Sequence, residues 1–396
     1  MMNHASTVLI LDANQRSALA ATRSLGKQLN TVIITADETP IALAQHSLFS
    51  TRYVQYPSPR LAPTAFCQWL VGFVADHNIS AVYPMTEISS QLVMMHREQL
   101  GECKIPFADY KTVMSIANKW HLVNLAEKLD IPHPATEVFS NSAEFSLSAV
   151  THFPVVLKPC LSHIWLEGEW LSTAVHIVDH ADQLEELLNT KAYFKHHPFM
   201  LQEFIPGHGA GIFALYNKGE AVTFFAHQRI REKPPGGGVS VLSASRPCDP
   251  SQLRYAKALL DGVNWHGVAM VEFRISEDGT PYLMEVNTRF WGSLQLSIDA
   301  GVDFPSLLHQ ITFGENPTPA RDYTEGQRLR WLLGDVDSLY LVLRSQKYSW
   351  QQKLRRMVDF LTPHPSTTRH EVNRLGDLGP AWFELKEYIG DLLRRR

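Results

Sequence analysis

Cysteine is scarce in this sequence, and the few cysteines form no recognisable framework. Four occur in 396 residues, at positions 67, 103, 160 and 248, and none belongs to a C-x-x-C pair. This spacing argues against a zinc site and against a disulfide-stapled fold, and it favours a reducing, cytoplasmic location.

Long apolar runs and an excess of positive charge are absent as well. The first apolar run, in MMNHASTVLILDANQ, reaches Asp12 too early for a signal peptide, and no later run approaches the roughly 18 residues that a membrane span needs. The formal charge of −4 does not suggest nucleic acid as the main partner. We therefore expect a soluble protein that acts on small molecules, with no membrane span.

Two common catalytic signatures are also missing. The segment after the first apolar strand reads DANQRSALA and lacks the G-x-G-x-x-G of dinucleotide-binding proteins, which counts against a dinucleotide-dependent oxidoreductase. No G-x-S-x-G is present to mark a serine nucleophile. The chemistry must be sought in other residues.

Apolar periodicity predicts three units. In residues 1–117, continuous apolar runs at 7–11, 31–35 and 80–83 alternate with helical patterns, which is typical of an open α/β sheet. Residues 118–315 mix strands and helices. Residues 316–396 carry mostly helical signals, and we expect a helical extension that packs on the body or on a second subunit, as in a homodimer.

The segment VAMVEFRISEDGTPYLMEVNTRFWGS, at 268–293, is the most informative part of the chain. It predicts a β-hairpin around an Asp-Gly turn, with Glu272 on one strand and Glu285 and Asn287 on the other. Asn287 faces the same side as Glu285, because residues two apart in a strand share a face, and hairpin pairing brings Glu272 beside them. Two carboxylates and an amide oxygen are suitable ligands for Mg²⁺, with Mn²⁺ as an alternative ion.

A solvated sheet face is the alternative for these acids. Apolar residues flank both glutamates, however, and unpaired charges are rarely placed among apolar neighbours without a function. Arg289 follows Asn287 by two residues and precedes an expected helix. Arginine there suits bidentate phosphate contact at a helix N-terminus, although a surface arginine on a turn is the plainer alternative.

The motifs E-F-x and E-V-N-x-R-x-x-G-S, on consecutive strands, resemble the metal-binding core of the ATP-grasp superfamily. The spelling EVNTRFWGS is most similar to ATP-grasp carboligases with a carbamoyl-phosphate-synthase-like core. The resemblance covers residues 1–315. It implies an ATP-grasp fold of mixed α/β and α+β class, in which a Rossmann-like pre-ATP-grasp domain precedes two lobes that clasp ATP.

The resemblance also implies the nucleotide-binding residues. Lys158 in PVVLKP resembles the family lysine that contacts the nucleotide phosphates, and Lys119 in ANKWHL resembles the earlier lysine at the start of the ATP-grasp domain. The segment QEFIPG resembles the hinge that holds adenine through its main chain. The implied ATP-binding set is Lys119, Lys158, Gln202, Glu203, Phe204, Ile205 and His208.

The sequence departs from the family pattern at three points. Many relatives have glutamate where this chain has Gln202. In place of the usual acid for the ribose hydroxyls the chain reads GHGAG, where His208 is the candidate substitute and a solvated histidine the alternative. The loop CLSHIWLEGEW after Lys158 has one glycine where relatives have several, which puts the mobility of a phosphate lid in doubt.

Two segments are candidates for the substrate side. Arg229 and Arg231 lie on one face of an expected strand before the glycine-rich loop 233–238, and they suit a carboxylate, with a solvated basic strand as the alternative. Thr86 and Glu87 follow a buried strand at its carboxyl end, where open α/β sheets bind ligands.

The resemblance implies an ATP-dependent ligase. Such an enzyme phosphorylates a carboxylate to an acyl phosphate and couples it to an amine, with Arg289 steadying the transferred charge. Three alternatives stay open: a carboxylase of the same fold that is biotin-independent or activates bicarbonate, a non-catalytic nucleotide-binding protein, and the oxidoreductase that the missing glycine motif disfavours.

Overall fold

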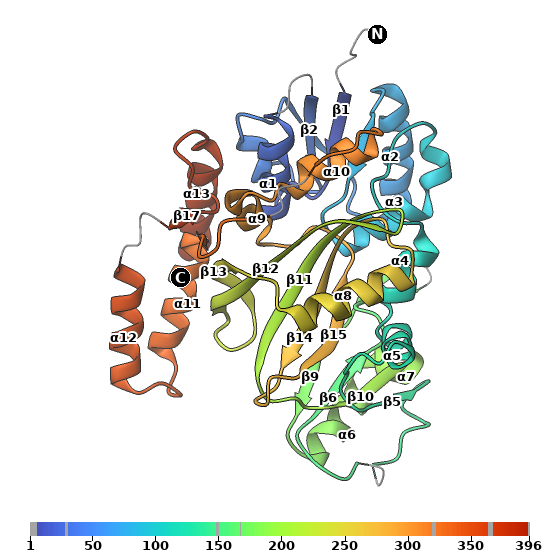
Figure 1. Cartoon of the computed structure of the whole chain (residues 1–396), viewed down its shortest axis with the longest axis vertical. Coiled ribbons are helices and arrows are strands. Elements are labelled where there is room, and N and C mark those ends of the chain that lie inside the picture. Colours follow the sequence, from blue (N-terminus) through green and yellow to red (C-terminus); the bar gives the residue numbers. More distant parts are fainter. Residues whose placement is uncertain are drawn as a thin grey trace.

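The structure is a computed structural model, and it describes residues 6–27, 31–147, 150–166, 168–318, 322–362 and 367–394. These residues form an N-terminal α/β unit, a small lobe, a large sheet and a C-terminal segment that lies to one side (Figure 1). No helix among them is long and apolar enough to cross a membrane. All four cysteines are unpaired.

The N-terminal unit is an open parallel sheet, as the alternating apolar runs predict. Its strands β1 (Ser6–Ile10), β2 (Thr31–Asp37), β3 (Arg52–Gln55) and β4 (Ala81–Tyr83) pair in the order β3-β2-β1-β4. Its helices are α1 (Arg16–Leu25), α2 (Pro63–Asp76), α3 (Glu87–Met95) and α4 (Tyr110–Ala117), with 3₁₀ turns η1 (Ala44–His46) and η2 (Arg97–Leu100). The sequence did not predict β3, because this short edge strand is half-exposed and has no apolar run.

A buried acid fixes the carboxyl edge of this sheet. Asp12 accepts hydrogen bonds from the backbone N–H groups of Met85 and Thr86 at 2.8 Å each, and from Ser89 Oγ at 2.5 Å. Thr86 and Ser89 also form a capping box that starts α3. These bonds hold the turn after β4, so that Glu87 begins α3 at this edge.

The small lobe has its own core. Strands β5 (Thr136–Phe139), β6 (Val155–Pro159), β9 (His176–Val178) and β10 (Phe199–Glu203) form an antiparallel sheet in the order β5-β10-β6-β9. Helices α5 (Lys119–Lys128), α6 (Ala181–Thr190) and α7 (Ala192–His196) accompany it, and β7 (His163–Leu166) pairs with β8 (Glu169–Ser172) in a separate hairpin. The lobe's apolar side chains pack apart from the main core.

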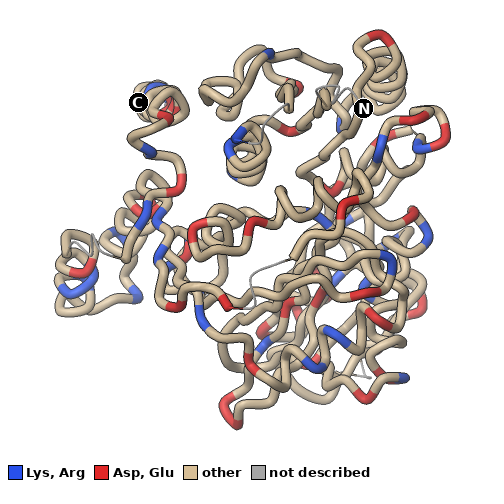
Figure 2. The backbone as a smooth tube through the Cα atoms, turned by 45° about the horizontal axis from the view of Figure 1, so that its top comes forward, with Lys and Arg blue, Asp and Glu red and all other residues tan. Residues whose placement is uncertain are grey.

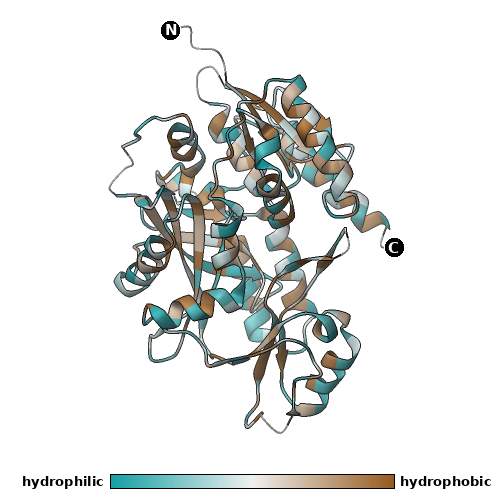
Figure 3. Ribbon diagram, turned by 90° about the vertical axis from the view of Figure 1, so that its right-hand side faces the viewer, coloured by the Kyte–Doolittle hydropathy of each residue, from teal (hydrophilic) through white to brown (hydrophobic). Residues whose placement is uncertain are grey.

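The large sheet carries the predicted hairpin. Its strands β11 (His208–Asn217), β12 (Glu220–Lys233), β13 (Val239–Arg246), β14 (Gly267–Ile275), β15 (Pro281–Asn287), β16 (Arg328–Arg330) and β17 (Thr368–His370) are arranged in the order β15-β14-β11-β12-β13-β16-β17. Helices α8 (Pro250–Gly262), α9 (Leu294–Ala300) and α10 (Phe304–Thr312) belong to the same body. Because α1 packs on α9 and α10, one apolar core runs from the N-terminal sheet into the large sheet, and the strands carry the hydrophobic residues (Figure 3).

The C-terminal segment contains helices α11 (Leu332–Arg344), α12 (Trp350–Leu361) and α13 (Gly379–Arg394). It also contains β16 and β17, which the sequence did not predict, and these add two strands to the large sheet. The segment is tied to the N-terminal unit, since Arg23 Nε lies 2.7 Å from Asp377 Oδ2. In α11, Val342 is buried, whereas Leu341 and Leu343 are exposed, and α12 buries no side chain.

Candidate active site

Glu272, Glu285 and Asn287 lie together on the β14–β15 hairpin, as the sequence predicts. The Glu272 and Glu285 backbones are direct cross-strand partners, next to a register shift after Glu272. Asn287 Nδ2 donates to Glu272 Oε1 at 3.0 Å and approaches Glu285 Oε1 at 3.5 Å. The hairpin thus brings the oxygens of both carboxylates to a single amide group.

This pair of acids is electrostatically suited to a cation. Burial, and then the neighbouring Glu285, raise the pKa of Glu272, while Arg229 and Arg289 oppose the rise. Within the described ranges no three His, Cys, Asp or Glu side chains converge on one point. The candidate set instead has two carboxylates and one amide, which fits Mg²⁺ when substrate phosphates complete its shell.

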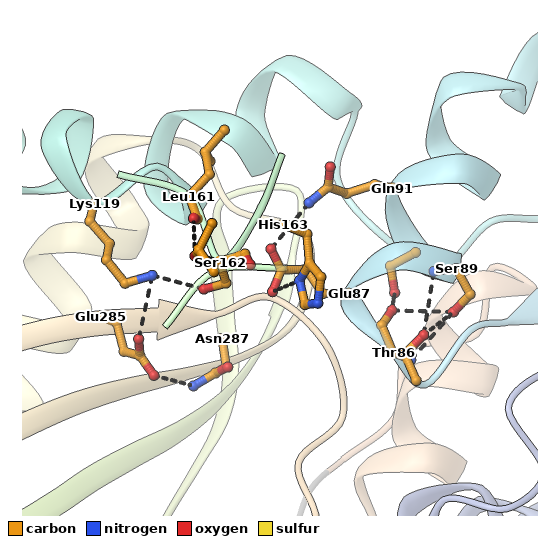
Figure 4. Close-up of polar contacts among 12 residues, drawn as sticks. Thr86, Glu87, Ser89, Gln91, Lys119, Leu161, Ser162, His163, Glu285 and Asn287 are labelled. Carbon is orange, nitrogen blue, oxygen red and sulfur yellow. Dashed lines mark hydrogen bonds and ion pairs between the residues drawn. The ribbon is translucent and has the colours of Figure 1, made fainter. Parts of the chain in front are cut away.

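Two lysines approach this pair from the small lobe. Lys119 begins α5 after its cap Asn118, and its Nζ lies 3.7 Å from Glu285 Oε2 and 2.9 Å from Ser162 Oγ (Figure 4). Lys158, on β6, is 6% exposed. Burial lowers the pKa of Lys158 to about 8, with Lys119 adding to the effect and Glu285 and Glu272 opposing it. Both predicted lysines therefore belong to the same charged site.

The predicted hinge connects β10 with β11. Gln202 is buried, and its Nε2 donates to Thr136 Oγ1 at 2.8 Å, while its Oε1 has no hydrogen-bond partner among the residues that the structure describes. The Glu203 side chain is exposed, Phe204 is half-buried, and Ile205 is buried with its carbonyl accepting from Arg274 Nε at 3.1 Å. The buried, unpaired Gln202 oxygen is a free acceptor for a ligand N–H. His208 is exposed at the start of β11.

Arg289 lies where two cavities meet. A cavity of about 260 Å³ is lined by Arg289 with the two glutamates and Asn287. A second cavity, of about 630 Å³, is lined by Arg289 with Glu87, Asp37 and Glu38 at the carboxyl edge of the N-terminal sheet. Arg289 is therefore positioned to contact groups in both cavities.

Glu87 and the β7–β8 hairpin meet across the second cavity. Glu87 Oε2 lies 3.2 Å from His163 Nδ1, and Gln91 Nε2 donates to Glu87 Oε1 at 3.2 Å (Figure 4). Burial favours a higher pKa for Glu87, but His163, Lys119 and Arg289 together hold the pKa below its usual value. Glu87 is thus a carboxylate at neutral pH, and it joins the small lobe to α3.

The structure separates the two predicted substrate arginines. Arg229 Nη2 lies 3.2 Å from Glu272 Oε2, whereas Arg231 Nη2 lies 2.5 Å from Asp335 Oδ2 in the C-terminal segment. A register irregularity between them breaks the period of two, so the expectation of a shared face is wrong. Arg229 belongs to the candidate site and Arg231 to a separate charged cluster.

Two residues at the site were not predicted from the sequence. Arg16 lines both cavities; its Nη1 lies 2.5 Å from Glu371 Oε2 and its guanidinium lies 3.9 Å from the centre of the Trp331 ring. His227 lines the smaller cavity, and burial lowers its pKa to about 3, which keeps it neutral. No local signal marks Arg16, but His227 is two residues before Arg229 in the segment considered for the substrate side.

Comparisons with known proteins agree with this geometry. A family model described as "ATP-grasp in the biosynthetic pathway with Ter operon" matches residues 195–334. A D-aspartate ligase of Enterococcus faecium (strain Aus0004) is 22% identical over 214 residues, which are 50% of this chain and 51% of that enzyme. The match therefore spans about half the length of this curated relative.

Solved structures show the same fold. An L-amino acid ligase from Bacillus licheniformis superposes with a TM-score of 0.60 at 17% identity, over 79% of this chain and 75% of that one. The biotin carboxylase domain of the Hydrogenobacter thermophilus 2-oxoglutarate carboxylase, complexed with MgADP, ADP and bicarbonate, gives 0.61 at 13% identity, over 81% and 73%. These matches confirm the fold that the motif resemblance implied. The chain is therefore similar to ATP-grasp proteins over residues 195–334, and it shares its fold with these ligase and carboxylase structures.

Proposed function

We propose that this protein is an Mg²⁺-dependent ligase that uses ATP to join a carboxylate to an amine. The observation that carries the proposal is the cluster of Glu272, Glu285 and Asn287 beside Lys119, with Arg289 connecting it to the larger cavity. Phosphoryl transfer requires positioning and charge neutralisation more than a protein nucleophile, and these residues supply both.

The nucleotide is proposed to lie between the small lobe and the large sheet. Adenine would contact the main chain of Glu203 and Ile205, and the unpaired Gln202 Oε1 would accept from its amino group. Lys119 and Lys158 would bind the phosphates. His208 is the proposed contact for the ribose.

The candidate metal ligands are Glu272, Glu285 and Asn287. The Asn287 amide would turn its oxygen toward the ion in place of its present N–H contacts. When bound, Mg²⁺ neutralises negative charge on the phosphate oxygens.

The reaction takes place in two steps. A carboxylate oxygen attacks the γ-phosphorus, the bond to the ADP oxygen breaks, and an acyl phosphate forms. The free amine then attacks the carbonyl carbon, the C–O bond to phosphate breaks, and the nitrogen loses its proton. Arg289 would hold the carboxylate first and stabilise the developing oxyanion afterwards.

The larger cavity supports an amine acceptor. Glu87, Asp37 and Glu38 line one part of it and Arg289 another, which suits a molecule with a cationic amine. Its volume of about 630 Å³ exceeds the need of bicarbonate. The names of the two ligase relatives point the same way.

A bicarbonate-activating carboxylase is the second candidate, favoured by structural neighbours that are biotin carboxylases. A screen of ADP release with paired carboxylates and amines, each with and without bicarbonate, separates the two. The ligase proposal expects ADP release that depends on both partners. ADP release that depends on bicarbonate supports the carboxylase, and Mg·ATP binding without turnover across the panel supports a non-catalytic protein.

A further inference from the structure

A third cavity, which is also charged, lies outside the candidate active site, between the large sheet and the C-terminal helix α12. It has a volume of about 660 Å³ and is bounded by β12, β13, β16, β17 and α12. Its lining includes four arginines and a histidine: Arg231, Arg328, Arg330, Arg356 and His370. None of its lining residues borders the cavity that contains Glu272 and Glu285. Several basic positions are visible where the C-terminal segment approaches the body (Figure 2).

Strands β16 and β17, which lie together at one side of the large sheet, contribute part of the cavity lining. β16 and β17 are parallel, with Arg328 paired to Thr368 and Arg330 paired to His370. Since residues two apart share a strand face, these four side chains lie on one face, which borders the cavity. Leu329, between the two arginines, belongs to the main apolar core. The alternation therefore fixes the arginines on the cavity side.

A single buried carboxylate accepts hydrogen bonds from three of the four arginines. Asp335, which is fully buried, accepts from Arg231 Nη2 at 2.5 Å, from Arg330 Nε at 2.7 Å and from Arg356 Nη2 at 2.7 Å. The Arg330 guanidinium also stacks at 4.2 Å from the centre of the Phe360 ring. The arginines are held in place before any ligand binds, which lowers the entropy cost of binding.

The positive charge of this cluster is not balanced. The four arginines face two carboxylates, Asp335 and Asp359, so the group has a formal charge of +2 in a chain whose formal charge is −4. Within the described ranges, Arg328 has no acidic partner at ion-pair distance. Two buried N–H groups, Arg231 Nε and Arg356 Nη1, have no hydrogen-bond partner among those residues. Buried donors are nearly always paired in proteins, so these two lack an acceptor.

We infer that this cavity is a binding site for a phosphate group carried by a small molecule. A phosphate dianion matches the excess of +2, and its oxygens would accept hydrogen bonds from the guanidinium groups that line the cavity. All the cations are arginines, whose planar forks bind phosphate through two hydrogen bonds at once. The volume leaves room for an organic part as well. The site is independent of the proposed ligase reaction.

Arg328→Gln in the full chain provides the test, because it removes a cavity cation that holds no structural ion pair. The probe is pyrophosphate, titrated by calorimetry in a metal-free buffer with chelator. We expect the wild type to bind and the variant to bind about tenfold more weakly, as the loss of a charge-assisted hydrogen bond implies. Inorganic phosphate, titrated in parallel, shows whether a bare phosphate suffices.

Arg369→Gln is the matched control. Arg369 lies between Thr368 and His370 on β17, its side chain is 58% exposed and pairs with Asp299, and its loss changes the net charge equally. The control should bind pyrophosphate like the wild type, and both variants should keep wild-type affinity for Mg·ATP. The inference is overturned if the wild type does not bind, or if Arg328→Gln binds normally while Lys158→Met does not, since the anion would then occupy the nucleotide site.

Discussion

At the scale of single residues, the candidate site combines charges that oppose one another until a ligand arrives. Lys158 is buried with a pKa of about 8, and Glu272 has a raised pKa beside Glu285. A phosphate chain with its metal would relieve both conditions, because it brings negative charge to the lysine and positive charge to the acids. Binding should therefore change the protonation of the site.

Lys158 gives a prediction with a definite sign. Its pKa in the free protein lies near 8, below the usual value, so at pH about 9 it is mostly neutral, and bound phosphates should raise the pKa and draw in a proton. Calorimetry in buffers of different ionisation enthalpy should show uptake approaching ~1 proton per ATP at pH about 9, and little at pH about 7. Lys158→Met should abolish the uptake; if uptake persists in this variant, the proton goes to another group.

Glu285→Gln tests the metal ligands. Loss of one carboxylate should misplace the γ-phosphate and lower turnover by roughly 10²–10³-fold, with an unchanged fold. Glu277→Gln, at the exposed turn of the same hairpin, is the matched control and should retain activity. Near-wild-type turnover in Glu285→Gln would remove Glu285 from the metal site.

At the scale of elements, the β7–β8 hairpin closes over the site from the small lobe. Ser162, just before β7, contacts Lys119, and His163 contacts Glu87 of α3. The sequence suggested reduced mobility of this loop from its low glycine content, and the structure gives it two polar anchors. We therefore expect this hairpin to have low mobility.

His163→Ala should loosen this hairpin. A partly exposed polar contact is worth up to about 1 kcal/mol, so amide exchange in strands β7 and β8 should quicken by up to about fivefold. His196→Ala, an exposed histidine in the same lobe, should leave the exchange unchanged. Equal exchange in all three proteins would show that the Glu87 contact does not hold the hairpin.

Local patterns explain which elements the sequence could predict. The β14–β15 hairpin has an Asp-Gly turn and long apolar strands, so both its pairing and the positions of Glu272 and Glu285 followed from the sequence. β16 is three residues long, contains two arginines and owes its place to pairing with β13 and β17, so no local pattern marks it. The irregularity in β12 likewise depends on its partner strand, and it misled the placement of Arg231.

At the scale of the whole molecule, the C-terminal segment supplies residues that hold a side chain of the candidate site in position. Arg16 is held by Glu371 and by the Trp331 ring, more than 300 residues along the chain. Such contacts depend on tertiary structure, which is why Arg16 could not be predicted from the sequence. The expected homodimer stays a prediction, as do the domain boundaries at 117 and 315.

Removing residues 316–396 should therefore damage the protein. A chain ending at Glu315 loses β16, which leaves the β13 edge open, and it loses both partners of Arg16, so we expect poor solubility or a lowered melting temperature. In the full chain, Glu371→Gln should cost about 3 kcal/mol, because it leaves a partly buried arginine without its charge partner. Thermal unfolding measures both, and an unchanged melting temperature in the truncated chain would make the segment an independent module.

Hydroxylamine trapping tests whether this protein makes an acyl phosphate, as we propose. Purified protein is incubated with Mg·ATP, a panel of carboxylates and hydroxylamine, and both the hydroxamate and the nucleotide product are measured. We expect one carboxylate class to yield hydroxamate together with equal amounts of ADP, and both products to fall sharply in Glu285→Gln. Hydroxamate accompanied by AMP and pyrophosphate would contradict it, because the carboxylate would then have been activated by adenylyl transfer.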